Sequence, residues 1–284
     1  MGETIDRAKE RAYFLATGLS PRRLAARWTG PRVLANSVPK SGTNLLTQCL
    51  SLFPMLRPSF DHVTMNYNRR LGTEELSAKA GATKRGQFTS GHIFHDAANA
   101  AIVEENDMRM LLMVRDPRDV VTSHFHYVTE KHPEHRLHEY YNDLPDDGER
   151  LMASIRGVDG EHTDDGDPLE SIGEWMDAFL AWEPKPYVEI IRFEDLIGPM
   201  GGGDRRSQEE TIRRIGAHLG VELDENDVEH IADNTYSTGS STFRKGLIGD
   251  WENHFTSEHV AAFKQEAGDA LIRLGYESDD KWSI

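Results

Sequence analysis

Apolar and polar positions along this chain fall into blocks that predict strands followed by helices. Val33, Leu34 and Val38 lie in the first block and predict a short strand over 32–38. The uninterrupted apolar run 108–114 is typical of a strand buried on both faces. Further strands are expected near 86–90 and over 187–193, and helices over 43–53, 208–219 and 256–274.

Asp116 and Pro117 follow the strand 108–114 at once. A capping aspartate with proline at the first helical position predicts a helix that starts there and runs past Tyr127. Strands that alternate with helices imply a mainly parallel sheet with helices on both faces. Ligands of such sheets bind beyond the carboxyl ends of the strands. Lys40, His92 and Arg115 each come just after a predicted strand, so we expect them on one edge of the sheet.

Two segments stand outside this alternation within a single domain spanning 1–284. Residues 1–30 are expected to form a helical N-terminal extension, interrupted near Ser20-Pro21. Residues 129–168 are polar, acidic and weakly periodic, and they are interpreted as a lid or insertion, with plain surface as the alternative. Trp175, Phe179 and Trp182 have near-helical spacing, which favours a place in the core.

Composition limits the classes of partner. The chain of 284 residues has 48 acidic and 32 basic residues and a net charge of -16, which argues against binding to nucleic acid. No apolar run approaches the ~18 residues of a membrane-spanning helix. The first thirty residues are too charged for a secretory signal, and Cys49 is the only cysteine. A cytoplasmic location is therefore expected.

The loop after the first strand is a candidate anion site. Strand 32–38 leads directly into a helix, whose first amide groups bind anions well. Gly42 lets the backbone approach a ligand, Lys40 adds a charge, and the hydrogen-bonding side chains are Ser41, Thr43 and Asn44. The loop lacks the Gly-x4-Gly-Lys order of a nucleotide kinase. The alternative is a helix capped by a polar turn.

Two other short patterns could contribute cations. Arg115 is followed eight residues later by Ser123, and an arginine fork with a hydroxyl suits a phosphate dianion. The alternative is that Arg115 pairs with Asp116 or Asp119. The third pattern places two cations beside a glycine at Arg244-Lys245-Gly246, which alone would be read as solvated charge.

Together and in this order, the three patterns resemble the motifs of the sulfotransferases that use 3'-phosphoadenosine 5'-phosphosulfate (PAPS), in particular the soluble cytosolic type. The matching segments are Pro39–Thr43, Arg115 with Ser123, and Arg244–Trp251, and the resemblance spans about residues 32–265. It implies an α/β, P-loop-like three-layer fold with a central, mainly parallel sheet. It also implies transfer of a sulfuryl group from PAPS to a hydroxyl or amine of a small-molecule acceptor. A carbohydrate or lipid acceptor, or a non-catalytic nucleotide-binding protein, is the alternative.

The resemblance also implies roles for individual residues. The loop Lys40–Asn44 would hold the 5'-phosphosulfate, with Lys40 as a catalytic charge. The 3'-phosphate would be held by Arg115, Ser123, Arg244, Lys245 and Gly246. Phe193 matches an aromatic near the adenine, and Phe243 precedes the last motif. The catalytic base would be His92, with His95 as its rival.

No metal is expected, with PAPS as donor and adenosine 3',5'-bisphosphate (PAP) as product. A run of histidines is interpreted as a polar lid in preference to a metal site: His124, His126, His132, His135 and His138.

The chain departs from the family pattern at three places. Leu45 stands where relatives stack a tryptophan on adenine. Ser90 stands where relatives have a lysine, two places before the base. The C-terminal dimer motif is degraded, with Glu252, Ser257 and Ala261 at three of its positions. The acceptor, the adenine contact and the oligomeric state therefore stay open, a homo-oligomer included.

Overall fold

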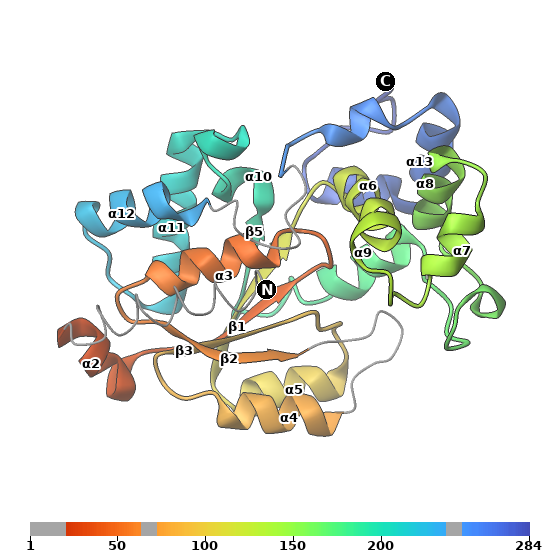
Figure 1. The fold of residues 1–284 in the computed structure, drawn as a ribbon. Helices are drawn as coiled ribbons and strands as arrows, with labels where there is room; N and C mark the ends of the chain where they lie inside the picture. Colours follow the sequence, from red (N-terminus) through yellow and green to blue (C-terminus); the bar gives the residue numbers. More distant parts are fainter. Residues whose placement is uncertain (1–20, 64–72, 237–245) are drawn as a thin grey trace.

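The computed structural model describes residues 21–63, 73–236 and 246–284 (Figure 1). Its centre is a five-stranded parallel sheet with the strand order β2-β3-β1-β4-β5. The strands are β1 (Arg32–Ser37), β2 (Arg57–Val63), β3 (Gln87–Gly91), β4 (Met108–Val114) and β5 (Val188–Arg192). The predicted parallel sheet is confirmed.

Helices cover both faces of the sheet and make three layers (Figure 1). One face carries α3 (Thr43–Leu52), α11 (Arg205–Leu219) and α12 (Glu225–Thr235). The other face carries α4 (Thr73–Ala82), α5 (Ala97–Glu105), α6 (Pro117–His126), α8 (Asp147–Arg156), α9 (Ile172–Leu180) and α13 (Ser257–Arg273). Shorter elements are α2 (Pro21–Thr29), α7 (His138–Asp143), α10 (Phe193–Leu196) and the turns η1 (Tyr127–Lys131), η2 (Gly160–His162), η3 (Pro199–Gly201) and η4 (Asp250–Asn253).

The apolar run of β4 explains how one strand serves two cores. Because successive side chains of a strand point to opposite faces, Leu111 and Met113 pack toward α3 and α11. Met110, Leu112 and Val114 pack toward α6 and α9. A strand covered on both faces cannot alternate with polar residues, which is why its sequence is continuously apolar.

Strand register brings the predicted site residues to one edge. Asn36 pairs with Gly91, Ser37 with Met113, and Val114 with Arg192, so four strands end at nearly the same level. The loop with Lys40, and then His92, Arg115 and Phe193, follow these ends directly. The expectation that the site residues lie at the carboxyl edge of the sheet is confirmed.

Segment 129–168 is more regular than its sequence pattern suggests. It contains α7 and α8, and Leu137, Tyr141, Leu151 and Ile155 are buried in the core against the other helices of this face. Its few apolar positions fall on the buried side of two short helices, a signal too brief to stand out in a polar stretch. Its role as a lid stays a prediction.

Other differences from the sequence interpretation have similar causes. Strand β2 was not expected, because an edge strand with a largely open middle has no apolar run. Strand β5 ends at Arg192, and Phe193 begins α10 instead of ending the strand. Helix α2 begins at Pro21, where the break was expected, while residues 1–20 of the predicted extension lie outside the described residues. Within the described part of the chain, no helix has the length and apolar character that a membrane crossing requires.

Candidate active site

The loop between β1 and α3 has the backbone of an anion site. Lys40 has a φ of 68° and Gly42 a φ of 102°, so both adopt the left-handed conformation. A Cβ atom on Gly42 would lie 2.6 Å from the Phe193 ring, which makes glycine necessary there. Gly42 also caps α3 without a side-chain hydrogen bond. The first amides of α3 therefore face the carboxyl edge with no intrahelical acceptor.

His92 is joined to this loop by hydrogen bonds. Its Nδ1 lies 2.8 Å from the carbonyl oxygen of Ser37 and 3.2 Å from the Ser37 hydroxyl, which in turn lies 2.8 Å from Thr43 Oγ1. A carbonyl can only accept, so Nδ1 carries the proton and Nε2 of the neutral ring is left as a proton acceptor.

The surroundings of His92 keep its ring neutral. Burial lowers the pKa of His92 to about 4, the Ser37 carbonyl opposes this shift, and His62 and Lys40 add to it. The His62 ring lies edge-on at 5.4 Å between centroids, and its Nδ1 is 2.7 Å from the Ser90 hydroxyl. At neutral pH the side chain is therefore a base that holds no proton on Nε2.

Asn36 fixes the backbone next to His92. Its side-chain amide donates to the carbonyl of Ile93 at 2.9 Å and accepts from the amide of Ile93 at 2.8 Å. Asn36 is completely buried, and these two bonds tie β1 to Ile93, two residues past the end of β3 at Gly91. This contact helps to hold His92 beside the loop between β1 and α3.

His95 faces another part of the molecule. Its backbone amide donates to the carbonyl of Ala178 in α9, and its ring packs edge-on against Trp182 at 4.8 Å between centroids. Neither of these two contacts involves the loop of Lys40, in contrast to the contacts of His92. The geometry thus favours His92 over His95 as the base.

Lys40 lies over the ring of Tyr127, with Nζ 3.6 Å from the ring centroid. Tyr127 begins the π-helical turn η1 at the end of α6. Turns of this kind are frequent at functional sites, and the face of an aromatic ring attracts a cation. Tyr127 thus helps to hold the lysine side chain at the carboxyl edge of the sheet.

The histidine run is not the polar lid that the sequence suggested. His124 and His126 are buried on α6, and His135 is buried in the segment between η1 and α7. The His124 ring packs edge-on against Trp175, and burial is the main cause that lowers the pKa of His124 and His135. Among the described residues, no group of three His, Cys, Asp or Glu side chains could hold a metal ion.

Arg115 and the last motif meet through Asp119. Arg115 Nη2 donates to Asp119 Oδ2 at 3.1 Å and to the carbonyl of Leu247 at 2.7 Å. The same carboxylate accepts from the amides of Gly249 and Trp251, at 2.9 and 3.0 Å. The ion pair with Asp119 was the alternative interpretation of Arg115. The structure shows that this pair joins two motifs 130 residues apart.

Phe193 lies beneath the loop. Its ring packs against Gly42, the Arg115 guanidinium lies 4.5 Å from its centroid, and only 5% of the residue is exposed. The side chain therefore supports the loop and Arg115 from below.

The remaining predicted residues are placed less completely. Ser41 is buried and Asn44 exposed at the start of α3, and Ser123 is half-buried on α6. Gly246 has a φ of 59°. Phe243, Arg244 and Lys245 lie outside the described residues.

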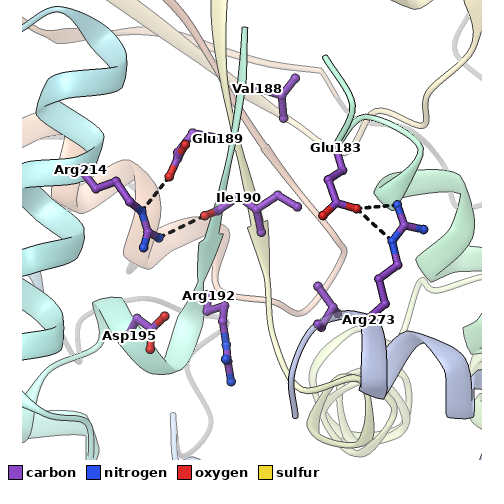
Figure 2. Close-up of a pocket in the computed structure, with 9 residues that line it drawn as sticks. Glu183, Val188, Glu189, Ile190, Arg192, Asp195, Arg214 and Arg273 are labelled. Atoms are coloured by element: carbon purple, nitrogen blue, oxygen red, sulfur yellow. Dashed lines mark hydrogen bonds and ion pairs between the residues drawn. The ribbon is translucent and has the colours of Figure 1, made fainter. Parts of the chain in front are cut away.

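A hollow of about 450 Å³ lies elsewhere, along the edge strand β5 (Figure 2). Arg214 pairs with Glu189 there, and Arg273 with Glu183, so its charges are matched within the protein. None of its lining residues belongs to the predicted site. This hollow therefore does not mark the candidate active site.

Sequence reasoning missed three residues that contact the predicted ones: Ser37, His62 and Tyr127. Asp119 was considered only as an alternative partner of Arg115, since an acid four residues after Arg115 lies on the same side of a helix. The other three meet the site only through the fold, because His62 arrives on β2 and Tyr127 at the end of α6.

Comparisons with known proteins place this geometry in context. The family model of the sulfotransferase domain matches residues 31–275. Sulfotransferase 6B1 of Danio rerio is 27% identical over 164 residues, which are 52% of this chain and 47% of that protein. Sulfotransferase 6B1 of Pan troglodytes is 23% identical over 270 residues, 87% of this chain and 80% of that protein. The chain thus spans about half of the first relative's length.

Solved structures share the fold. Mouse sulfotransferase SULT7A1 complexed with PAP superimposes with a TM-score of 0.59 and 16% identity, covering 90% of each chain. Retinol dehydratase in complex with androsterone and inactive cofactor PAP has a TM-score of 0.55 and 17% identity, covering 88% of this chain and 85% of the other. At this level of identity the likeness concerns the fold.

Proposed function

The chain belongs to the sulfotransferase family, and from that premise we propose that it moves a sulfuryl group from PAPS to a hydroxyl of a small-molecule acceptor. One observation carries the proposal beyond family membership. His92 presents an unprotonated Nε2 at the same edge of the sheet as Lys40 and the phosphate loop. A base and a cation beside an anion-binding helix terminus are the groups that this transfer needs.

The residues of the loop fit the donor. The Ser41 hydroxyl is buried and has no hydrogen-bond partner within the described ranges, as expected of a group that bonds a bound anion. The amides at the start of α3 and the Lys40 charge would hold the 5'-phosphosulfate. Arg115, Ser123, Arg244, Lys245 and Gly246 would hold the 3'-phosphate, and the hydrogen bond from Arg115 to the Leu247 carbonyl supports this grouping.

The protein groups divide the chemistry of the transfer between them. The donor supplies an activated sulfur whose bond to the 5'-phosphate oxygen breaks as the acceptor oxygen bonds to it. His92 Nε2 takes the proton of the acceptor hydroxyl, and the Ser37 carbonyl stabilises the imidazolium through Nδ1–H. Lys40 neutralises the charge that grows on the departing phosphate oxygen. PAP and the sulfated acceptor are the products.

Ligand-induced thermal stabilisation tests the proposal against its rivals. PAP at a hundred times its dissociation constant should stabilise the chain by about 2.7 kcal/mol, whereas ATP with magnesium should give little shift. Transfer from labelled PAPS to a panel of phenols, alcohols, amines, sugars and lipids then identifies the acceptor class. Stabilisation by PAP with no transfer to any acceptor would favour a non-catalytic nucleotide-binding protein. Preference for ATP with magnesium would contradict the proposal.

We expect Arg244→Ala to weaken PAP binding by roughly 2 kcal/mol, or about thirtyfold, because it removes a charge-assisted contact to the 3'-phosphate. Adenosine 5'-phosphosulfate lacks that phosphate and should bind nearly as before. Isothermal titration with both nucleotides measures the difference. Arg206→Ala is the matched control, since the Arg206 side chain is 87% exposed and pairs with Glu210 on α11. Equal weakening of both nucleotides would show that Arg244 has another role.

A further inference from the structure

Side chains of the C-terminal segment 276–282 contact Arg118 and Glu194, two residues that adjoin the turn after Arg115. Glu277 Oε1 accepts from Arg118 Nη1 at 2.6 Å, and the Tyr276 hydroxyl donates to Glu194 Oε2 at 2.7 Å. The Trp282 ring is 9% exposed and covers the Arg118 guanidinium. None of these three C-terminal side chains lies in a sequence motif.

Arg118 is the centre of this contact. Its guanidinium lies against two indoles that are nearly perpendicular to each other, 4.0 Å from the ring centroid of Trp251 and 4.7 Å from that of Trp282. Its Nε and Nη2 also bond both carboxylate oxygens of Asp116, at distances of 2.7 to 3.2 Å. The residue is 3% exposed. A buried guanidinium with a partner on every side has one orientation, so it fixes whatever it joins.

What Arg118 joins are two parts of the proposed nucleotide site. Asp116 directly follows Arg115, and its amide donates to Glu194 Oε1 at 2.9 Å, so the turn is held from a second side by the acid that Tyr276 bonds. Trp251 ends the last motif, and its own amide donates to Asp119.

We propose that Glu277 and Trp282 are positioning residues of the nucleotide site. They hold Arg118 between the turn of Arg115 and the motif that ends at Trp251, and thereby set the spacing of the two groups that bind the 3'-phosphate. The inference rests on the proposed function, because it concerns the same nucleotide. It adds that a segment remote from the ligand is energetically coupled to its binding, and such coupling is reciprocal.

Nucleotide titrations of C-terminal variants test the inference. Trp282→Ala should raise the Kd for PAP about tenfold, because the Arg118 guanidinium loses a buried aromatic partner. Glu277→Gln should raise this Kd less, because Arg118 then loses a charged partner. The Kd for adenosine 5'-phosphosulfate should stay within about twofold of the wild-type value. Trp282→Phe keeps an aromatic face and should restore most of the PAP affinity. Lys281→Ala is the matched control, since that lysine is 85% exposed in the same segment.

A second measurement needs no substitution. By the reciprocity of the coupling, saturating PAP should slow amide hydrogen exchange of 276–282 in the wild-type chain, and adenosine 5'-phosphosulfate should slow it less. If Trp282→Ala and Glu277→Gln leave PAP affinity unchanged, the inference is wrong. It is equally wrong if both nucleotides weaken together with a lower Tm, because the segment then only stabilises the fold. A wild-type chain that binds no PAP would instead overturn the proposed function.

Discussion

Replacing Lys40 with alanine should lower turnover about a thousandfold while weakening PAP binding only a few-fold. The side chain lies against the face of Tyr127 at the carboxyl edge of the sheet, where the departing oxygen of the donor would develop negative charge. That charge is greatest on the departing oxygen in the transition state and smaller in either bound nucleotide. An interaction that strengthens in the transition state appears in kcat more than in affinity.

Single-turnover rates and PAP titrations on the same preparation separate the two effects. Lys84→Ala is the matched control, because Lys84 is exposed beside the N-terminal end of β3, opposite the site edge. Lys40→Arg keeps the charge and should recover part of the rate. Equal losses in turnover and in PAP affinity would mean that Lys40 only binds the nucleotide.

His92→Asn should reduce turnover about 100-fold or more, the usual contribution of a general base, with donor binding nearly unchanged. Asparagine is close in size and keeps a donor that can reach the Ser37 carbonyl, so the loop should keep its place. Neither phosphate of the donor needs the imidazole. Single-turnover rates and PAP titrations of the variant measure the two quantities.

His95→Asn is the control built into the chain, because His95 packs on Trp182 and should be replaceable with little loss of rate. An inactive His95 variant beside an active His92 variant would reverse the assignment. Full activity of both variants would mean that the acceptor arrives as a ready nucleophile.

The pH dependence of the wild-type rate belongs to the same prediction. The free histidine value of about 6.5 would suggest a rise near neutrality. In the folded chain, burial lowers the pKa of His92 to about 4. The base form is therefore already complete at pH 6, and the rate of an unionised acceptor should decline only as pH falls toward about 4.

The stability of the fold should also decrease as the pH falls, so it must be measured together with the rate. Since the pKa values of His92, His124 and His135 are lowered, the unfolded chain takes up protons that the folded chain does not. Their contribution to stability is present above about pH 6.5 and is lost as pH falls toward the folded values. Circular dichroism at each pH distinguishes loss of the base from loss of the fold.

Strands β1, β3, β4 and β5 and the loops that follow them were predictable, because their signals lie in short stretches of sequence. Strand β4 is continuously apolar because both of its faces are covered, and Asp116-Pro117 marks the start of α6 by its own side-chain chemistry. Edge strand β2 and the short helices α7 and α8 were not predictable. Their stability comes from neighbours that arrive from elsewhere in the chain, as Leu151 and Ile155 illustrate by packing into the core shared with α13.

The sequence by itself determined the family, and it singled out the loop after β1 and the residues that we propose as reactive groups, because these signals depend on residue type and on spacing within a few residues. Only the tertiary structure decided their states and partners. It gives His92 its tautomer through the Ser37 carbonyl and its low pKa through burial. It joins Arg115 to Gly249 through Asp119. Burial and contacts over more than a hundred residues are properties of the folded chain, and no short pattern contains them.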